Sequence, residues 1–192
     1  FVATDKGLLK LNENNSKFEP TEITTGCYCL SASKDNLYIA TTDGLFLYDG
    51  KNYKLVLEEF TYSVFCDSTN NELYVGTDYN FYKGKLVANK LEIAARLDDI
   101  GAVRYIASDK YGNIAFATAT DGIFILTKQS KFIHITTKEG LPEMSENHLF
   151  TYDGVIYITN NKGFYEWNQS NENRVTYSTS MNPHSAFKYV SS

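Results

Sequence analysis

The sequence predicts an all-β fold, a β-propeller of about five four-stranded blades, alone or as part of a larger seven-bladed propeller. Three observations lead to this prediction. A strand–turn–strand unit recurs five times along the 192 residues, at intervals of about 36 to 42 residues, and such a period built only from strands is typical of propellers. Tyr and Phe, which favour strands, occur 15 and 12 times. No stretch sustains the apolar spacing of three and four residues that a helical repeat needs.

The recurring unit is clearest around residues 114–125, where two apolar strands flank a short turn. Each unit has Gly or Asn at the end of its turn, at Gly7, Gly44, Asn80, Gly122 and Gly163. Both residue types tolerate the positive φ that a tight hairpin requires, which is how we interpret their recurrence. The aspartates beside two of these turns, Asp43 and Asp121, are expected to cap their own hairpins.

Turn clusters and the starts of innermost strands divide the chain into blades. The expected blades are 1–26, 27–60, 61–101, 102–146 and 147–180, with 181–192 as the innermost strand of a closing or next blade. The first blade lacks its own innermost strand. In the third, we expect a short hairpin at Lys83-Gly84-Lys85 and a long outer strand, rather than a helix, over 86–97.

The chain begins inside a strand pattern at Phe1, and residues 185–190 resemble an innermost strand. Two explanations compete. The tail pairs with the Phe1 strand and closes a five-bladed ring, or the chain is a piece of a larger propeller. The sequence leaves both explanations open.

Composition narrows the range of partners. The chain has 18 Lys and Arg against 23 Asp and Glu, a formal net charge of −5, which argues against a surface that binds nucleic-acid phosphates. No apolar run is long enough to span a bilayer, so we expect no membrane contact by this region itself.

The residues predict no catalytic, metal or cofactor site. Cys27, Cys29 and Cys66 are expected to be buried free thiols, because neither the spacing of a zinc site nor an even count for disulfides is present. Since Cys27 and Cys29 alternate along one strand, they should share a face. No nucleophile motif occurs, so we expect no enzyme. Trp167 follows a third strand and is expected to pack within a blade.

Candidate ligand-binding residues lie where a propeller gathers its loops on one face. These are the entries to the innermost strands and the turns between second and third strands. The residues are Tyr28, Tyr62, Asp78, Tyr79, Arg104, Asn147 and His148. Aromatic rings stack on the apolar faces of sugars, and fork-shaped polar groups pair with hydroxyls. The alternative is that these side chains serve packing or are ordinary surface residues.

The fourth repeat resembles a known blade consensus. It contains Asp109, Gly112 and Ile114 through Thr118, then Gly122-Ile123, and finally Gly140-Leu141-Pro142 before Asn147. This pattern resembles the two-component regulator propeller, and the likeness covers nearly the whole chain. The sequence departs from that family at the blade position of Trp, which is held by Tyr38, Tyr74, Ala115 and Tyr157.

The resemblance implies the periplasmic sensor region of a hybrid two-component histidine kinase, a noncatalytic propeller that detects an oligosaccharide. It also implies a periplasmic or cell-surface location, and we expect signalling through a homodimer. The alternative is a cell-surface or secretion-associated propeller that binds protein partners. A third hypothesis is a propeller enzyme, such as a lyase or a glycosidase. We disfavour it because the sequence does not indicate the catalytic histidines, or the carboxylates close together on the propeller axis, that such an enzyme needs.

Overall fold

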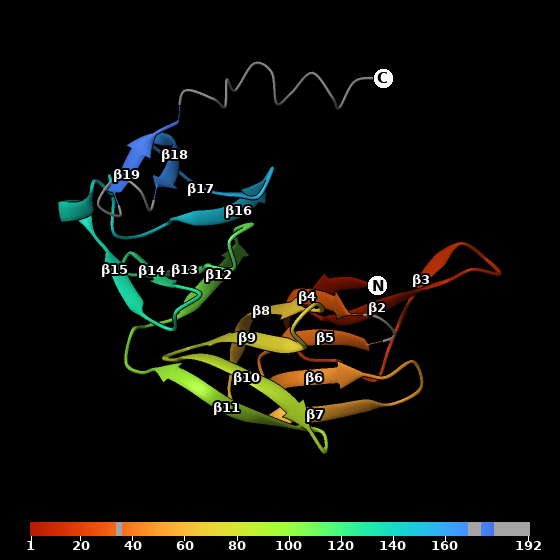
Figure 1. The fold of residues 1–192 in the computed structure, drawn as a ribbon. Helices are drawn as coiled ribbons and strands as arrows, with labels where there is room; N and C mark the ends of the chain where they lie inside the picture. Colours follow the sequence, from red (N-terminus) through yellow and green to blue (C-terminus); the bar gives the residue numbers. More distant parts are fainter. Residues whose placement is uncertain (34–35, 169–173, 179–192) are drawn as a thin grey trace. The chain divides into compact units, whose positions relative to one another are not determined.

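Figure 1 shows the fold in a computed structural model of the chain, which describes residues 1–33, 36–168 and 174–178. These residues form five sheets and contain no α-helix, only a short 3-10 helix, η1 (Thr137–Glu139). In every sheet, strands that follow one another in sequence are neighbours. The predicted all-β class is confirmed. The strand expected over 185–190 lies outside the described residues.

Four sheets have four strands and the first has three. The first sheet consists of β1 (Val2–Thr4), β2 (Gly7–Asn12) and β3 (Lys17–Pro20). The second consists of β4 (Cys27–Ser33), β5 (Asn36–Thr41), β6 (Gly44–Tyr48) and β7 (Tyr53–Leu57). The third consists of β8 (Thr61–Asp67), β9 (Glu72–Thr77), β10 (Phe81–Val87) and β11 (Lys90–Leu97). The fourth consists of β12 (Val103–Ser108), β13 (Ile114–Thr118), β14 (Ile123–Leu126) and β15 (Phe132–Ile135). The fifth consists of β16 (His148–Tyr152), β17 (Val155–Asn160), β18 (Gly163–Asn168) and β19 (Arg174–Tyr177).

The tight hairpin of the repeat is closed by a threonine side chain. Thr41 Oγ1 donates to the carbonyl of Gly44 at 2.8 Å and accepts from the backbone N–H of Asp43 at 3.1 Å. The same threonine-to-carbonyl bond recurs in the β1–β2, β9–β10 and β13–β14 hairpins. The expectation that Asp43 and Asp121 cap these turns is wrong: among the described residues no backbone N–H of the hairpins donates to either carboxylate, and the threonine hydroxyl accepts from the backbone instead.

Glycine is needed at the hairpin end for two reasons. Gly44 has a φ of 141°, and a Cβ there would lie 2.3 Å from the carbonyl oxygen of Leu57. Asn80 does not share this conformation, since it is absent from the residues with positive φ. The expectation of positive φ is therefore wrong at Asn80. Its carbonyl accepts from the Thr77 backbone at 2.8 Å, and its side-chain amide bonds the Tyr82 hydroxyl at 3.0 Å.

The third sheet differs from the prediction in the position of its last turn. Lys83-Gly84-Lys85 lies inside β10, where the register shifts between Lys83 and Gly84 as it pairs with β11. The turn is formed by Ala88 and Asn89, whose φ values of 49° and 64° are those of a two-residue hairpin. The preference for an outer strand over a helix is confirmed by β11, although residues 86 and 87 belong to β10.

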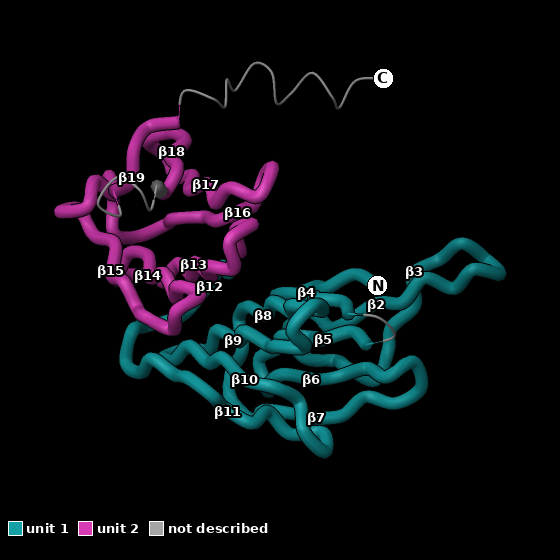
Figure 2. The backbone as a smooth tube through the Cα atoms, in the orientation of Figure 1, with its two compact units in different colours: residues 1–106 teal, residues 107–192 magenta. Residues whose placement is uncertain are grey.

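The chain divides into two compact units, residues 1–106 and 107–192, coloured separately in Figure 2. In the first unit, one apolar cluster joins the second and third sheets through Tyr38, Leu47, Val64, Leu73 and Val75. In the second, the core includes Ala115, Ile123, Ile158 and Trp167. Trp167 is buried inside β18 rather than after it, and its predicted packing role is confirmed. Tyrosine and alanine fill the blade positions that lack tryptophan.

The three cysteines are free, as predicted, with Cys27 and Cys66 buried and Cys29 half-buried. The expectation that Cys27 and Cys29 share a face is wrong. Cys27 packs in the cluster that includes Leu8, whereas Cys29 packs against a different cluster. The cause is a β-bulge. Cys27 pairs with Thr41 and Cys29 pairs with Ala40, so Tyr28 is an extra residue in β4 without a partner of its own in β5. An extra residue reverses the alternation of side chains.

Candidate functional site

A second bulge of the same kind occurs at the start of β8. Thr61 pairs with Thr77 and Ser63 pairs with Gly76, so Tyr62 is the extra residue. Tyr28 and Tyr62, both predicted as site residues, are thus the bulged residues of two successive innermost strands. β-Bulges re-aim a side chain out of the regular pattern and are frequent beside binding sites. The local backbone therefore frees these two rings from core packing.

Three aromatic rings meet at this point, and we call Tyr28, Phe60 and Tyr62 the aromatic platform. The Phe60 and Tyr62 rings stack with centroids 4.4 Å apart and an interplanar angle of 29°. Tyr28 lies 5.3 Å from Phe60 and 5.2 Å from Tyr62. Aromatic pairs at these separations stabilise one another beyond simple burial. The platform is therefore a single contacting group, with Phe60 as a member that the sequence analysis did not select.

Arg104 completes the platform. Its guanidinium carbon lies 3.8 Å from the centroid of the Tyr62 ring, a cation–π contact. Two groups stacked this closely on one ring must occupy opposite faces, so Arg104 and Phe60 together cover Tyr62. Tyr28, with 49% of its surface exposed, is the platform ring most open to solvent.

The strands that carry Tyr62 and Arg104 are tied together beneath the rings. Ser63 Oγ donates to the carbonyl of Val103 at 2.8 Å in a buried hydrogen bond. Ser63 directly follows Tyr62 in the sequence, and Val103 directly precedes Arg104. Gly76 lies against both, because a Cβ there would be 2.4 Å from Ser63 Oγ and 2.5 Å from a Val103 methyl group. This close approach sets the spacing between Tyr62 and Arg104.

Asp78 lies in the turn after β9, and a backbone hydrogen bond joins this turn to Phe60 of the platform. Burial is the main cause that raises the pKa of the Tyr62 hydroxyl; the Asp78 carboxylate adds to this rise and Arg104 opposes it. The backbone N–H of Asp78 donates to the Phe60 carbonyl at 3.1 Å, so the turn is fixed to the platform.

Tyr79 follows Asp78 in the same turn. Its side chain is 62% exposed, and its carbonyl accepts from the backbone N–H of Ile100 at 3.0 Å. The backbone is thus anchored while the ring is presented to solvent. Five of the predicted site residues, Tyr28, Tyr62, Asp78, Tyr79 and Arg104, belong to the first unit.

The other two predicted residues, Asn147 and His148, belong to the second unit. The Asn147 side chain is only 1% exposed; its Nδ2 donates to the Glu143 carbonyl at 2.9 Å, and its Oδ1 accepts from Asn160 at 3.0 Å. His148 is exposed and pairs with Thr159 at the start of β16. The site described here is therefore built from the first unit alone.

The platform offers recognition chemistry. Arg104 has five N–H donors, and within the part of the chain that the structure describes no hydrogen bond or ion pair engages them. An open ring, a guanidinium held by stacking and a nearby carboxylate suit a ligand with apolar faces and polar edges. Among the described residues, no cluster of three or more His, Cys, Asp or Glu is arranged to hold a metal ion.

No protein-family model matches this sequence, and no curated protein matches it. Solved structures do. The extracellular domain of one hybrid two-component system from B. thetaiotaomicron aligns with a TM-score of 0.71 and 18% identity over 92% of this chain and 26% of that chain. A second such domain from the same organism aligns with a TM-score of 0.63 and 20% identity, over 81% of this chain and 22% of that chain. The β-propeller domain of Myceliophteria thermophila Cps50 (Swd1) aligns with a TM-score of 0.56 and 12% identity, over 71% of this chain and 48% of that chain.

These likenesses confirm the β-propeller fold predicted from the repeat. They also agree with the resemblance seen in the sequence, because extracellular domains of hybrid two-component systems are among the structural neighbours. The chain spans about a quarter or less of the length of those domains. Within its described residues, no helix has the length and apolar character needed to cross a membrane.

Proposed function

We propose that this chain is the ligand-sensing part of a two-component signalling protein, located outside the cytoplasm, and that its aromatic platform binds an oligosaccharide. The observation that carries the proposal is the combination of the open Tyr28 ring, the stacked Arg104 guanidinium and the Asp78 carboxylate. Sugars present apolar ring faces to aromatic side chains and hydroxyls to fork-shaped polar groups. The likeness to extracellular domains of hybrid two-component systems supports the signalling role as a fold-level analogy.

The proposed role is noncatalytic. A ligand changes a signalling equilibrium only by the difference in its affinity for the two states. In our proposal, sugar binding at the platform favours one arrangement of two protomers in a homodimer, and a kinase on the other side of the membrane responds to that arrangement. The homodimer is tested by measuring the molar mass of the wild-type chain in solution, with and without ligand.

The experiment is a thermal-shift screen of the chain against oligosaccharides of several linkage types, with the corresponding monosaccharides as controls. A ligand that binds only the folded state raises the midpoint by mass action. Hits are then titrated by calorimetry against wild type, Tyr28→Ala and Arg104→Lys. Loss of the Tyr28 ring contact should weaken binding about tenfold, since about 1.4 kcal/mol corresponds to one decade in Kd. Lysine keeps the charge of Arg104 but lacks its planar fork, so it should also weaken binding.

Tyr111→Ala is the matched control, because Tyr111 is 64% exposed and lies outside the platform. It should bind like wild type. A cooperatively melting protein that responds to no oligosaccharide would refute the sugar ligand. A hit that binds Tyr28→Ala and Tyr111→Ala equally well would refute the platform as its site.

A further inference from the structure

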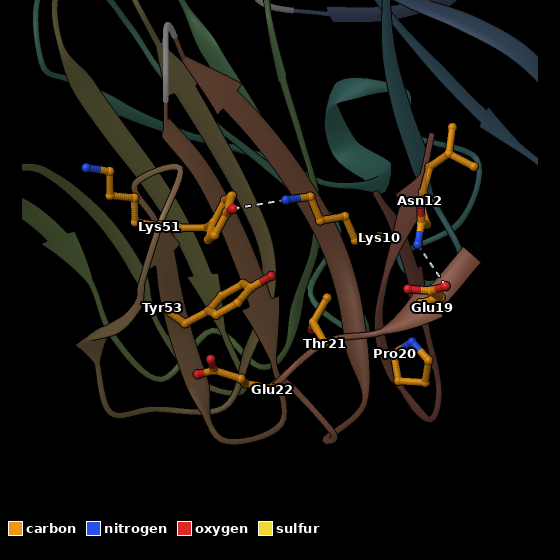
Figure 3. Close-up of a pocket in the computed structure, with 10 residues that line it drawn as sticks. Lys10, Asn12, Glu19, Pro20, Thr21, Glu22, Lys51 and Tyr53 are labelled. Atoms are coloured by element: carbon orange, nitrogen blue, oxygen red, sulfur yellow. Dashed lines mark hydrogen bonds between the residues drawn. The ribbon is translucent and has the colours of Figure 1, made fainter. Parts of the chain in front are cut away.

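A groove of about 530 Å³ lies in the first unit and shares no residue with the aromatic platform. Figure 3 shows the side chains that line it, which come from β2, from β3 and the segment after it, from β6, from the turn before β7, and from the first residue of β7. Pockets that hold small ligands typically range from about 300 to 1,000 Å³. The groove is therefore large enough for a ligand.

One wall of the groove is aromatic. Tyr48 and Tyr53 pair across β6 and β7 and stack with centroids 4.6 Å apart at 29°. Lys10 lies against this wall: its Nζ donates to the Tyr48 hydroxyl at 3.2 Å and lies 5.4 Å from the Tyr48 ring centroid. An ammonium group has three donors, so two of them remain for a ligand while the third holds the side chain in place.

The opposite side of the groove presents a fixed acceptor. Glu19 Oε1 accepts from the side-chain amides of Asn12 and Asn15, both at 3.0 Å. The two amides orient the carboxylate, and no bond within the described residues uses Oε2. Because the carboxylate is already positioned, a ligand hydroxyl that donates to it need not restrict a free side chain, which lowers the entropic cost of binding.

The charges that line the groove identify the class of ligand. Two lysines, Lys10 and Lys51, are balanced by two glutamates, Glu19 and Glu22. A balanced lining gives no net attraction to a polyanion or a polycation. It offers separate donors and acceptors beside an aromatic wall, which suits a molecule whose hydroxyls both donate and accept.

We propose that this groove is a second binding site, specific for neutral oligosaccharides and independent of the platform. The proposal goes beyond the proposed function, because the groove uses other residues and would bind sugar whether or not the platform does. It predicts that two separate sets of backbone amides respond to sugars, one at each site.

The test is an amide NMR titration of the full chain with four neutral hexasaccharides, maltohexaose, cellohexaose, xylohexaose and laminarihexaose, and with one acidic hexasaccharide, hexagalacturonic acid. At least one hexasaccharide should shift the amides of Asn12, Thr21 and Lys51. Glu19→Ala should weaken this binding tenfold or more, because a hydrogen bond to a charged group is lost. Lys51→Ala, at an exposed turn, is a second variant that should weaken it several-fold. Tyr28→Ala should leave the groove titration unchanged.

Glu92→Ala is the matched control, since Glu92 is also an exposed glutamate on an outermost strand of the first unit. It should bind like wild type. The proposal is overturned if no neutral hexasaccharide shifts the groove amides, if Glu19→Ala and Glu92→Ala bind equally, or if an acidic hexasaccharide binds the groove more tightly. Shifts confined to amides near Tyr28 and Tyr62 would reject the groove and leave the platform proposal standing.

Discussion

Gly76→Ala tests whether close packing behind the platform sets the position of its rings. A Cβ at Gly76 would lie 2.4 Å from Ser63 Oγ and 2.5 Å from a methyl group of Val103. Neither neighbour can simply turn away, because both are buried and the Ser63 hydroxyl is bonded to the Val103 carbonyl. The added methyl must therefore separate β8 from β12, and with them Tyr62 from Arg104.

Two effects set the expected loss of stability. Overpacking of a tight interior costs about 1–3 kcal/mol. Breaking the Ser63 hydrogen bond leaves a buried carbonyl without a partner, at about 1–3 kcal/mol more. The free energy of unfolding should fall by about 2–6 kcal/mol in total. With a urea m value of about 2 kcal/mol/M, the urea midpoint should fall by about 1–3 M.

Urea unfolding followed by far-UV circular dichroism measures this change. Gly26→Ala is the control: its nearest neighbour would be the side-chain hydroxyl of exposed Thr42 at 3.1 Å, so its midpoint should change little. Ser63→Ala combined with Gly76→Ala should cost at least 0.5 kcal/mol less than the sum of the single variants, because residues in contact are not additive. Equal losses for Gly76→Ala and Gly26→Ala, or strict additivity with Ser63→Ala, would refute the packing argument.

Three further predictions concern other parts of the chain. The Lys54 side chain and two backbone N–H groups lower the pKa of Asp49, so Asp49→Asn should lower the urea midpoint at pH 7. The difference in midpoint between wild type and Asp49→Asn should shrink as the pH falls below about 4, because the carboxyl of the unfolded chain takes up a proton before that of the folded chain. Asn147→Ala removes two hydrogen bonds of a buried side chain, to the half-buried Glu143 carbonyl and the half-buried Asn160 amide. The free energy of unfolding should fall by about 1–3 kcal/mol, as measured by the fluorescence of Trp167 in urea. Burial raises the pKa of the Cys27 thiol to about 11, so at pH 8 a disulfide reagent should label it only as urea unfolds the chain.

Each of these predictions has a direct control. Asp43→Asn, at another exposed turn, should not lower the urea midpoint comparably at pH 7. If the difference in midpoint between wild type and Asp49→Asn stayed constant down to pH 2, the stability would not depend on the charge of Asp49. Asn161→Ala is exposed and should unfold like wild type; a similar result for Asn147→Ala would mean that its hydrogen bonds contribute nothing. Rapid labelling of Cys27 in native buffer, located by peptide mapping, would show that the thiol is not buried.

The repeat could be predicted from sequence because its hairpins depend on local chemistry. A residue that tolerates a tight turn recurs at each hairpin end, and the flanking apolar strands follow directly. The same regularity brought Tyr28, Tyr62 and Arg104 together as candidates, since they hold matching places at the start of successive innermost strands. Their ring and cation contacts in the first unit follow from that matching position.

The failed predictions share a physical cause, which is that backbone irregularities leave little trace in residue type. The bulge at Tyr28 reversed the faces of Cys27 and Cys29, although no Gly or Pro marks it. The hairpin at Ala88 and Asn89 was missed because Gly84 nearby suggested a turn. Phe60 was missed because it is the last residue of the expected blade 27–60, whereas the candidates were taken from the entries to innermost strands and from the turns between second and third strands.

The bulges have a consequence for how such a protein can change. A bulged residue has no partner across the ladder, so its side chain can be exchanged without disturbing the pairing of either strand. Tyr28 and Tyr62 each occupy such a place, while the residues on both sides of them keep the core intact. Each of these repeats thus has one position whose side chain can be replaced while the strand pairing stays as it is, so the surface beside the platform can vary in sequence without a change in the blade.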